Sequence, residues 1–274
     1  MIYTDQKLSR LLAPHMQRVL VIDPVPSGAR LLGELMKDLG ARNIYSETTD
    51  VRALSAVKAI EPQLIFTELK GPNLDGLDFV RRLRRSDMAS RQAPVIIVTA
   101  EATAGAIVAA RDAGAHEFLR KPYTIKDLLR RLEAVSLRSR DWIEAVHYVG
   151  PDRRRFNSGD YQGPRKRQTD NPPTPDAARI TQALKILKAA IPAIDTDPVQ
   201  ALRAMQAQAA ELHKTAMTTC DMKLSDAASN LQRLLNQAVA SGIMVRADIE
   251  ACAAPLWTFM PAEAPKAEVA KTAA

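Results

Sequence analysis

Short apolar runs alternate with stretches of helical periodicity between about residues 18 and 140. The apolar runs predict strands at 18–22, 43–47, 63–67, 93–100 and 116–120. The stretches between and after them repeat apolar residues at helical spacing, and they predict helices at 27–40, 51–60, 76–86, 104–115 and 124–140. Strands that alternate with helices in this way predict an α/β fold: a doubly wound, five-stranded parallel sheet with helices on both faces.

The pattern changes after residue 145, where aliphatic residues become scarce. Residues 147–175 are rich in Gly, Pro, Arg and Asp, and they predict a linker. Helical periodicity returns over 176–260 and predicts an all-α module, either a small bundle or a helical hairpin, with Asp176 as its first N-cap. The Ala-, Lys- and Pro-rich tail at 261–274 is expected to be disordered. This division leaves 1–16 as an N-terminal extension and 17–146 as the α/β domain.

The composition argues against several classes of function and site. Aromatic residues are only 4% of the chain, which argues against a large surface for stacking bases. The two cysteines, Cys220 and Cys252, form no CxxC pair, and the four histidines are scattered, so no metal site is expected from them. The N-terminal stretch carries charges throughout, and no apolar run approaches the ~20 residues that span a bilayer. We therefore expect a soluble, cytoplasmic protein.

Four polar residues fall where predicted strands end. Asp23 follows the first strand and Glu68 follows the third, while Thr99 lies near the end of the fourth and Lys121 follows the fifth. The carboxyl ends of parallel strands meet at one edge of a sheet, which is where ligands bind in such folds. The sequence therefore predicts that these two acids, the hydroxyl and the ammonium group converge at one site.

Two stretches that contain these residues carry a family resemblance. The sequence EPQLIFTELKGPNLDGLDFV begins at residue 61, and VIIVTAEATAGAIVAARDAGAHEFLRKPY begins at residue 95. Both resemble the receiver domain of bacterial two-component response regulators, which has the CheY-like, flavodoxin-like fold. The resemblance covers about residues 17–138, with its motifs in the right order and at the right spacing.

The resemblance implies a site for phosphoryl transfer. In the family an aspartate attacks the phosphoryl donor, Mg²⁺ bridges the carboxylates and the phosphate, and a lysine and a threonine hold the phosphate oxygens. Carried over by position, Glu68 stands at the phosphoacceptor position. Thr99 and Lys121 match the phosphate-sensing pair, and Phe118 falls at the aromatic switch position.

Two departures from the family pattern coincide. The family has two adjacent acids after the first strand, whereas this chain has Asp23 followed by Pro24, which offers no side-chain oxygen to a metal. We therefore expect Mg²⁺ binding to be weak or absent, and no other cofactor. Glu68 is one methylene longer than aspartate, and phosphoryl transfer is sensitive to displacements of about 1 Å. These changes predict a degenerate receiver, or pseudo-receiver, in which Glu68 contacts Lys121; the alternatives are a decayed pocket with Glu68 facing solvent, or an atypical glutamate phosphoacceptor.

The formal net charge of +7 is concentrated in part in the predicted linker. Its cationic residues are candidates for anion binding, since arginine matches phosphate oxygens: Arg153, Arg154, Arg155, Arg165, Lys166 and Arg167. A cyclic di-nucleotide or a nucleic acid would be the ligand. The run RRRFNSG lacks the spacing of a PilZ-type site, and no DNA-reading motif is visible, so a solvated spacer is the other interpretation.

Two further features favour structural roles. Arg81, Arg82, Arg84 and Arg85 crowd one predicted helix and are expected to form its exposed polar face. His213 lies on a predicted helix of the C-terminal module, but the residues after it do not have the spacing of a histidine phosphotransfer domain, so we expect a structural or surface histidine.

Together these observations predict a non-catalytic signalling adaptor that acts without phosphorylation in a bacterial two-component-type pathway. Its partner is expected to be a signalling protein that binds the face formed by the fourth helix, fifth strand and fifth helix of the α/β domain. Two alternatives remain: an anionic ligand at the arginine-rich linker, and a phosphorelay receiver with Glu68 as acceptor.

Overall fold

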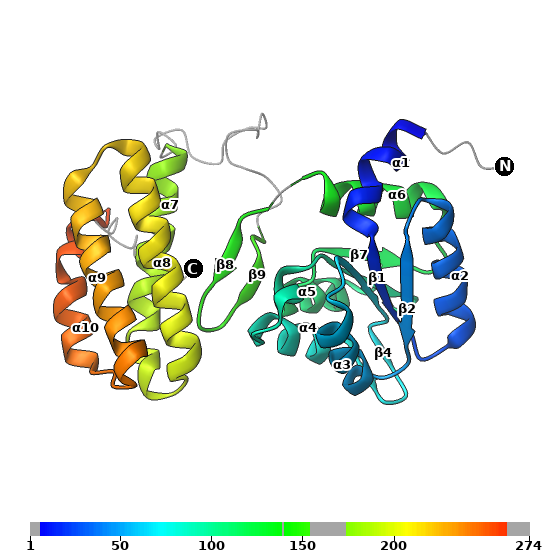
Figure 1. Ribbon diagram of the computed structural model, residues 1–274, viewed down its shortest axis with the longest axis horizontal. Helices are drawn as coiled ribbons and strands as arrows, with labels where there is room; N and C mark the ends of the chain where they lie inside the picture. Colours follow the sequence, from blue (N-terminus) through cyan, green and yellow to red (C-terminus); the bar gives the residue numbers. More distant parts are fainter. Residues whose placement is uncertain (1–5, 139, 154–173, 262–274) are drawn as a thin grey trace, which may run out of the picture. The chain divides into compact units, whose positions relative to one another are not determined.

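The computed structural model describes residues 6–138, 140–153 and 174–261. The chain divides into two compact units, Met1–Arg155 and Phe156–Ala274 (Figure 1).

The first unit is built on a five-stranded parallel sheet with the strand order β2-β1-β3-β6-β7. The strands are β1 (Arg18–Ile22), β2 (Asn43–Glu47), β3 (Leu64–Thr67), β6 (Val95–Thr99) and β7 (Glu117–Arg120). Ile22 at the end of β1 lies opposite Thr67 at the end of β3, so these two strands end in register. The predicted doubly wound sheet is thereby confirmed.

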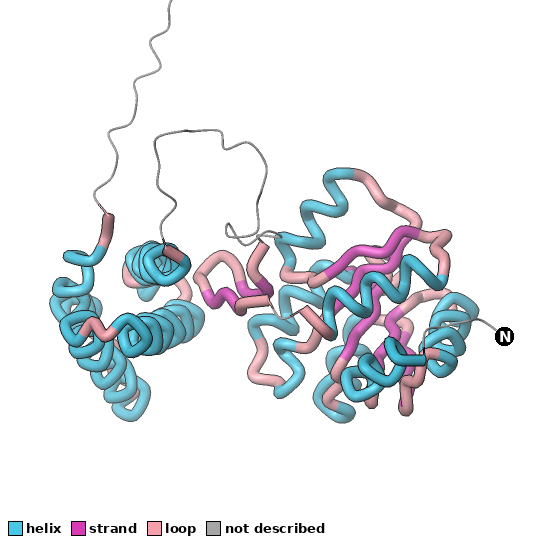
Figure 2. Tube along the Cα trace, turned by 90° about the horizontal axis from the view of Figure 1, so that it is seen from above, coloured by secondary structure: helices cyan, strands magenta, loops and turns pink. Residues whose placement is uncertain are grey.

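Helices cover both faces of this sheet (Figure 2). One layer contains α1 (Gln6–Leu12), α2 (Pro26–Asp38) and α6 (Ile125–Ser136), and the other contains α3 (Asp50–Ile60), α4 (Gly76–Arg85) and α5 (Ala104–Ala113). Side chains of β1 alternate between the two cores, as the period of two in a strand requires. Val19 and Val21 join the first core, whereas Leu20 and Ile22 join the second.

The α/β domain begins before residue 17, where we had placed its boundary. Helix α1 is followed by the 3₁₀ turn η1 (Ala13–Met16), and Leu12 and Met16 are fully buried in the core beside α2 and α6. The predicted N-terminal extension is therefore part of the fold from residue 6 onward. The sequence did not predict this helix, because only one face of a short helix is buried and charged residues therefore interrupt its apolar ones.

Two short antiparallel hairpins accompany the sheet. The first joins β4 (Lys70–Gly71) to β5 (Leu74–Asp75), and the second joins β8 (Trp142–Glu144) to β9 (Val149–Pro151). We had expected a linker to begin at residue 147. This boundary is wrong, because β9 of the second hairpin lies within the predicted linker. Val149, Gly150 and Pro151 are buried, so the fold continues into a stretch whose glycine and proline suggested a linker. The rest of that linker, residues 154–173, lies outside the described residues.

The second unit is helical, as predicted. It comprises α7 (Pro175–Ala190), η3 (Pro192–Asp195), α8 (Pro198–Thr219), α9 (Met222–Ser241), α10 (Arg246–Ala253) and η4 (Ala254–Phe259). The first N-cap is Thr174, whose hydroxyl accepts a hydrogen bond from Ala177 N, and not Asp176 as we had expected. Pro175 at the first helical position fits this start, because that position needs no N–H donor. Most of the predicted tail, 262–274, lies outside the described residues.

Within the described residues, no helix combines the length and apolar character needed to cross a membrane. The cytoplasmic location expected from the sequence stays a prediction.

Candidate functional site

Asp23 lies one residue beyond β1, where the parallel pairing continues past the strand. Its backbone N–H donates to Glu47 O at 3.0 Å. Its side chain is nearly buried, and Oδ1 accepts a hydrogen bond from Val25 N at 2.8 Å. This local turn between an aspartate and the second residue after it fixes the direction of the carboxylate. The second oxygen, Oδ2, is left to accept a hydrogen bond from Lys121.

Glu68 occupies the corresponding position beyond β3. Its N–H donates to Ile22 O at 2.8 Å, so the strand pairing also extends to this residue. Its Oε1 accepts a hydrogen bond from Leu69 N at 2.9 Å. The side chain is 13% exposed and does not extend into solvent, which rules out for this structure the alternative of a solvent-facing glutamate.

Lys121 links the two acids. Its ammonium Nζ donates to Asp23 Oδ2 at 2.8 Å and to Glu68 Oε2 at 2.7 Å. The expected contact between Glu68 and Lys121 is therefore present, and Asp23 shares it. Burial lowers the pKa of Lys121, but the hydrogen bonds and negative charges of Glu68 and Asp23 outweigh burial, so the pKa is raised above its ordinary value. The ammonium stays charged between its two partners.

Thr99 and Phe118 lie on the neighbouring strands. Thr99 ends β6 and is buried, and its hydroxyl accepts a hydrogen bond from Glu101 N at 3.2 Å. Its backbone carbonyl accepts a hydrogen bond from Lys121 N at 2.7 Å, which holds the lysine at the sheet edge. Phe118 is partly buried on β7 and packs against the core formed with α3, α4 and α5. The structure thus places Thr99 and Phe118 on adjacent strands, with Lys121 directly after the second of these strands.

Pro24 is packed against the β4–β5 hairpin. A Cβ atom added to Gly71 would lie 2.4 Å from Pro24 Cγ, so only glycine lets the hairpin approach the proline ring this closely. The ring stands directly beside Asp23, where the family has its second acid. This contact was not predicted, because nothing in the sequence pairs positions 24 and 71.

The carboxylate oxygens of the site are engaged by groups of the chain itself. Both oxygens of Asp23 and both oxygens of Glu68 accept hydrogen bonds from within the chain. Mg²⁺ demands near-octahedral coordination by oxygen, usually including one or two carboxylates. Pro24 adds no oxygen to this set. Among the described residues, no group of three or more acidic, histidine or cysteine side chains has an arrangement that could hold a metal ion.

The candidate anion-binding residues fall mostly outside the described part of the chain. This applies to Arg154, Arg155, Arg165, Lys166 and Arg167. Arg153 is described and belongs to the first unit. Its guanidinium lies 3.8 Å from the ring centroid of Tyr148 and 3.1 Å from Asp112 Oδ1, so local groups already engage it.

In the second unit, His213 has structural partners. Its Nδ1 lies 3.2 Å from Ser225 Oγ and 3.1 Å from Ser229 Oγ, across the contact between α8 and α9. This arrangement agrees with the structural role expected from the sequence.

The expectation of an exposed arginine face on α4 is wrong at one position. Arg84 is 1% exposed and donates to three backbone carbonyl oxygens, whereas Arg81 and Arg82 are exposed. A signal was available in the sequence: Arg84 follows Val80 by four residues, which places it on the buried face of the helix.

Comparisons with known proteins agree with this architecture. The family described as "Response regulator receiver domain" matches residues 19–133. The chemotaxis protein CheY-3 of Vibrio cholerae serotype O1 is 27% identical over 118 residues, which cover 43% of this chain and 90% of CheY-3. The DNA-binding response regulator MtrA of Mycolicibacterium smegmatis is 30% identical over 125 residues, which cover 46% of this chain and 53% of MtrA.

Solved structures resemble the same part of the chain. Chemotaxis protein CheY4 of Vibrio cholerae has 22% sequence identity and a TM-score of 0.41, with 44% of this chain and 98% of that chain covered. The receiver domain of sensor histidine kinase PA1611 from Pseudomonas aeruginosa PAO1, crystallised with magnesium in its active-site cleft, has 24% identity and a TM-score of 0.40, covering 43% of this chain and 96% of that chain. Given the family match and its curated relatives, residues 19–133 form a response regulator receiver domain of the two-component type.

Proposed function

We propose that this chain is a non-enzymatic signalling adaptor whose receiver domain works without phosphoryl transfer. The observation that carries the proposal is the ion triad formed by Lys121 with Asp23 and Glu68, at 2.8 and 2.7 Å. The lysine pairs with both acids at once and offsets part of their negative charge without a metal ion. The receiver would then hold one arrangement in the absence of any phosphoryl donor.

The geometry of Glu68 disfavours attack on a phosphoryl donor. A nucleophilic carboxylate needs an oxygen that can turn into line with the phosphorus atom. Here Oε1 is turned back to its neighbour Leu69 N, and Oε2 is bound to Lys121. These hydrogen bonds hold the carboxylate in one orientation and make both oxygens weaker nucleophiles, and Pro24 stands where the family has a further acid to help bind Mg²⁺. We therefore propose that Mg²⁺ binding is weak or absent.

The partner surface we propose is the face made by α5, β7 and α6. Ile107 and Val108 on α5 are 41% and 45% exposed, which gives this face apolar side chains to bury against a protein partner. Phe118 lies on β7 beneath the same face, so its position would influence the surface. Binding there would not depend on phosphorylation.

Phosphorylation can be tested directly. The wild-type protein is incubated with acetyl phosphate and Mg²⁺, and its intact mass is measured. The double variant Pro24→Asp with Glu68→Asp, which restores the acids of the family, serves as the matched positive control. We expect the double variant to gain the mass of a phosphoryl group and the wild type to remain unmodified. A phosphoryl adduct mapped to Glu68 in the wild type would instead establish the atypical phosphoacceptor and overturn the proposal.

A further inference from the structure

The β8–β9 hairpin is attached to the receiver domain by a buried arginine. Arg84 on α4 donates from Nε to Gly114 O at 3.0 Å, and from Nη1 to Arg91 O at 2.6 Å and Ala93 O at 2.9 Å. Its guanidinium carbon lies 5.3 Å from the ring centroid of Trp142 in β8. The side chain therefore joins α4, the connection between α5 and β7, and the hairpin.

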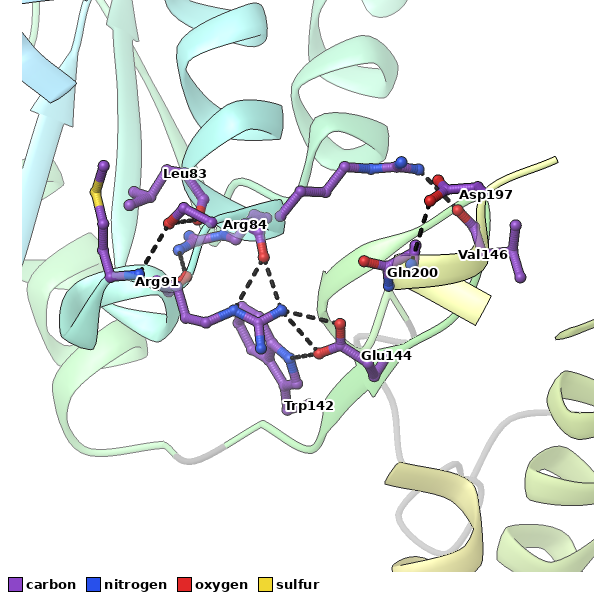
Figure 3. A network of polar contacts seen from close by, with 11 residues as sticks. Leu83, Arg84, Arg91, Trp142, Glu144, Val146, Asp197 and Gln200 are labelled. Carbon is purple, nitrogen blue, oxygen red and sulfur yellow. Dashed lines mark hydrogen bonds and ion pairs between the residues drawn. The ribbon is translucent and has the colours of Figure 1, made fainter. Parts of the chain in front are cut away.

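A second arginine fastens the hairpin through a carboxylate (Figure 3). Arg91 Nη2 lies 2.9 Å from Glu144 Oε1 and 3.0 Å from Oε2, and it also donates to Arg84 O at 2.8 Å. Trp142 Nε1 donates to Glu144 Oε2 at 3.1 Å. Glu144 is nearly buried. Charge-assisted hydrogen bonds shielded from water are stronger than exposed ones, so this is a firm attachment.

The backbone of the hairpin also lies directly against the backbone of the receiver domain. A Cβ atom added to Gly114 would lie 2.6 Å from Val149 O, and Gly114 has a φ of +97°, which side chains other than glycine rarely adopt. Arg85 Nη2 also donates to Val146 O at 2.7 Å. The hairpin thus rests directly on the turn that leads from α5 into β7.

The residues that begin β7 are held from several sides. His116 Nδ1 lies 3.2 Å from Arg84 Nη2, and its carbonyl accepts a hydrogen bond from Arg140 Nη1 at 3.0 Å. Glu117 is bound by Arg131 at 3.0 Å and by Arg140. Directly after the other end of β7, Lys121 is bound by Asp23 and Glu68. Phe118, the switch position, therefore lies on a strand that is fixed at both ends.

We propose that the β8–β9 hairpin is a clamp that holds the segment from Gly114 to Glu117 and so keeps Phe118 and the α5–β7 face in one arrangement. The clamp rests on the proposed function, because it completes a receiver that has one state. It acts at the opposite end of β7 from the ion triad, so the two devices can be separated by experiment. A loosely attached extension would leave Gly114–Glu117 unchanged when the hairpin is released.

The test removes the attachment and follows backbone amide hydrogen exchange in the full chain. Trp142→Ala deletes the ring beside Arg84, and Glu144→Gln is a milder variant that keeps the shape but removes the charge. His147→Ala is the matched control, because His147 is exposed in the turn of the same hairpin. The reporting amides are Gly114, Ala115 and His116, whose N–H groups bond to Arg111 O, Ala110 O and Val95 O.

We expect exchange of these amides to accelerate by about tenfold or more in Trp142→Ala, since a buried charge-assisted contact is lost, and by less in Glu144→Gln. The N–H groups of Asp23 and Glu68, at the far edge of the sheet, should keep wild-type exchange. Fluorine NMR of protein labelled with 4-fluorophenylalanine adds a second readout, with Phe118→Leu used to assign the signal. Phe118 should give one narrow line in the wild type and a broadened or split line in Trp142→Ala.

Two results would overturn the clamp. In the first, the hairpin amides Ala145 and Asp152, which bond to Tyr148 O and Asp141 O, exchange faster while residues 114–116 stay protected. In the second, neither variant changes protection or the Phe118 line. If Trp142→Ala fails to fold, the same comparison with Glu144→Gln decides. Phosphorylation of the wild type at Glu68 would refute the proposed function but would leave these exchange results standing.

Discussion

His116 makes the first unit sensitive to mild acid. Its Nδ1 lies 3.2 Å from Arg84 Nη2 and 3.3 Å from Val95 N, and both of these groups can only donate hydrogen bonds. Nδ1 must therefore carry no proton. Burial, followed by the positive charges of Arg84 and Arg140, holds the pKa of His116 well below its ordinary value of 6.5.

The sign and size of the effect follow from proton linkage. In the unfolded chain this imidazole regains its ordinary pKa, so below that pH the unfolded state binds a proton that the folded state does not. The free energy of unfolding then falls with the pH. The stability that neutral His116 contributes is fully present above the pKa of the unfolded chain, and it is lost progressively as the pH falls below that pKa. For one such histidine the loss between pH 7.0 and pH 5.5 is about 1.3 kcal/mol.

The assay is urea unfolding at these two pH values, followed by the fluorescence of Trp142. Trp257→Phe provides the background, so that the second unit does not contribute to the signal. His116→Asn removes the titration but can place an amide oxygen near the position of Nδ1. His147→Asn is the control, because that side chain is exposed in the turn of the β8–β9 hairpin.

We expect the wild type and His147→Asn to lose about 1.3 kcal/mol more than His116→Asn over this interval. Carboxylates that also titrate contribute equally to all three proteins and cancel in the difference. The reasoning would be refuted if His116→Asn lost as much stability as the wild type. That result would mean that the folded state accepts the proton, so that Nδ1 could not be the acceptor for Arg84.

Three further predictions concern other sites. Lys121→Met should lower receiver stability at neutral pH by about 2–4 kcal/mol, because two nearly buried carboxylates lose their shared cation. Urea unfolding measures this loss, and an unchanged midpoint would contradict the prediction. Gly71→Val should destabilise by about 1–3 kcal/mol through overlap with the Pro24 ring, and a double-mutant cycle with Pro24→Ala should recover part of the loss. Asp221→Ala should cost the second unit about 1 kcal/mol in thermal unfolding, because Asp221 Oδ1 caps α9 through Leu224 N at 3.0 Å, whereas Asp226→Ala at an exposed position should have little effect.

The sheet and its carboxyl edge could be predicted because their signals are local. A buried strand followed by a polar residue fixes where Asp23, Glu68 and Lys121 lie, since the period of the strand and the parallel pairing leave little freedom. The contact between Glu68 and Lys121 could be predicted from their opposite charges at one edge of the sheet. The second contact of Lys121, with Asp23, could not be predicted, because it depends on how the hydrogen bond from Val25 N orients the Asp23 carboxylate.

The hairpin and its arginine could not be inferred in the same way. Arg84, Gly114 and Trp142 are far apart in the chain, and their contact depends on tertiary packing. Each residue alone has an ordinary local interpretation: an arginine on a polar helix, a glycine after a helix, and a tryptophan before a linker. Only the buried position of Arg84 on its helix carried a warning, since a charge is rarely buried without partners.

The attached hairpin has a practical consequence for how the domain is cut. The family match ends at residue 133, and a fragment that stops there would lack Trp142, Glu144 and Val149. The Arg84 guanidinium, whose pKa burial lowers to about 9, would lose the cover that Trp142 provides, and Arg91 would lose its carboxylate. Recombinant fragments for binding screens should therefore extend to residue 153 and begin by residue 6. Shorter fragments would test a destabilised domain, and a missing interaction could then be mistaken for a missing partner.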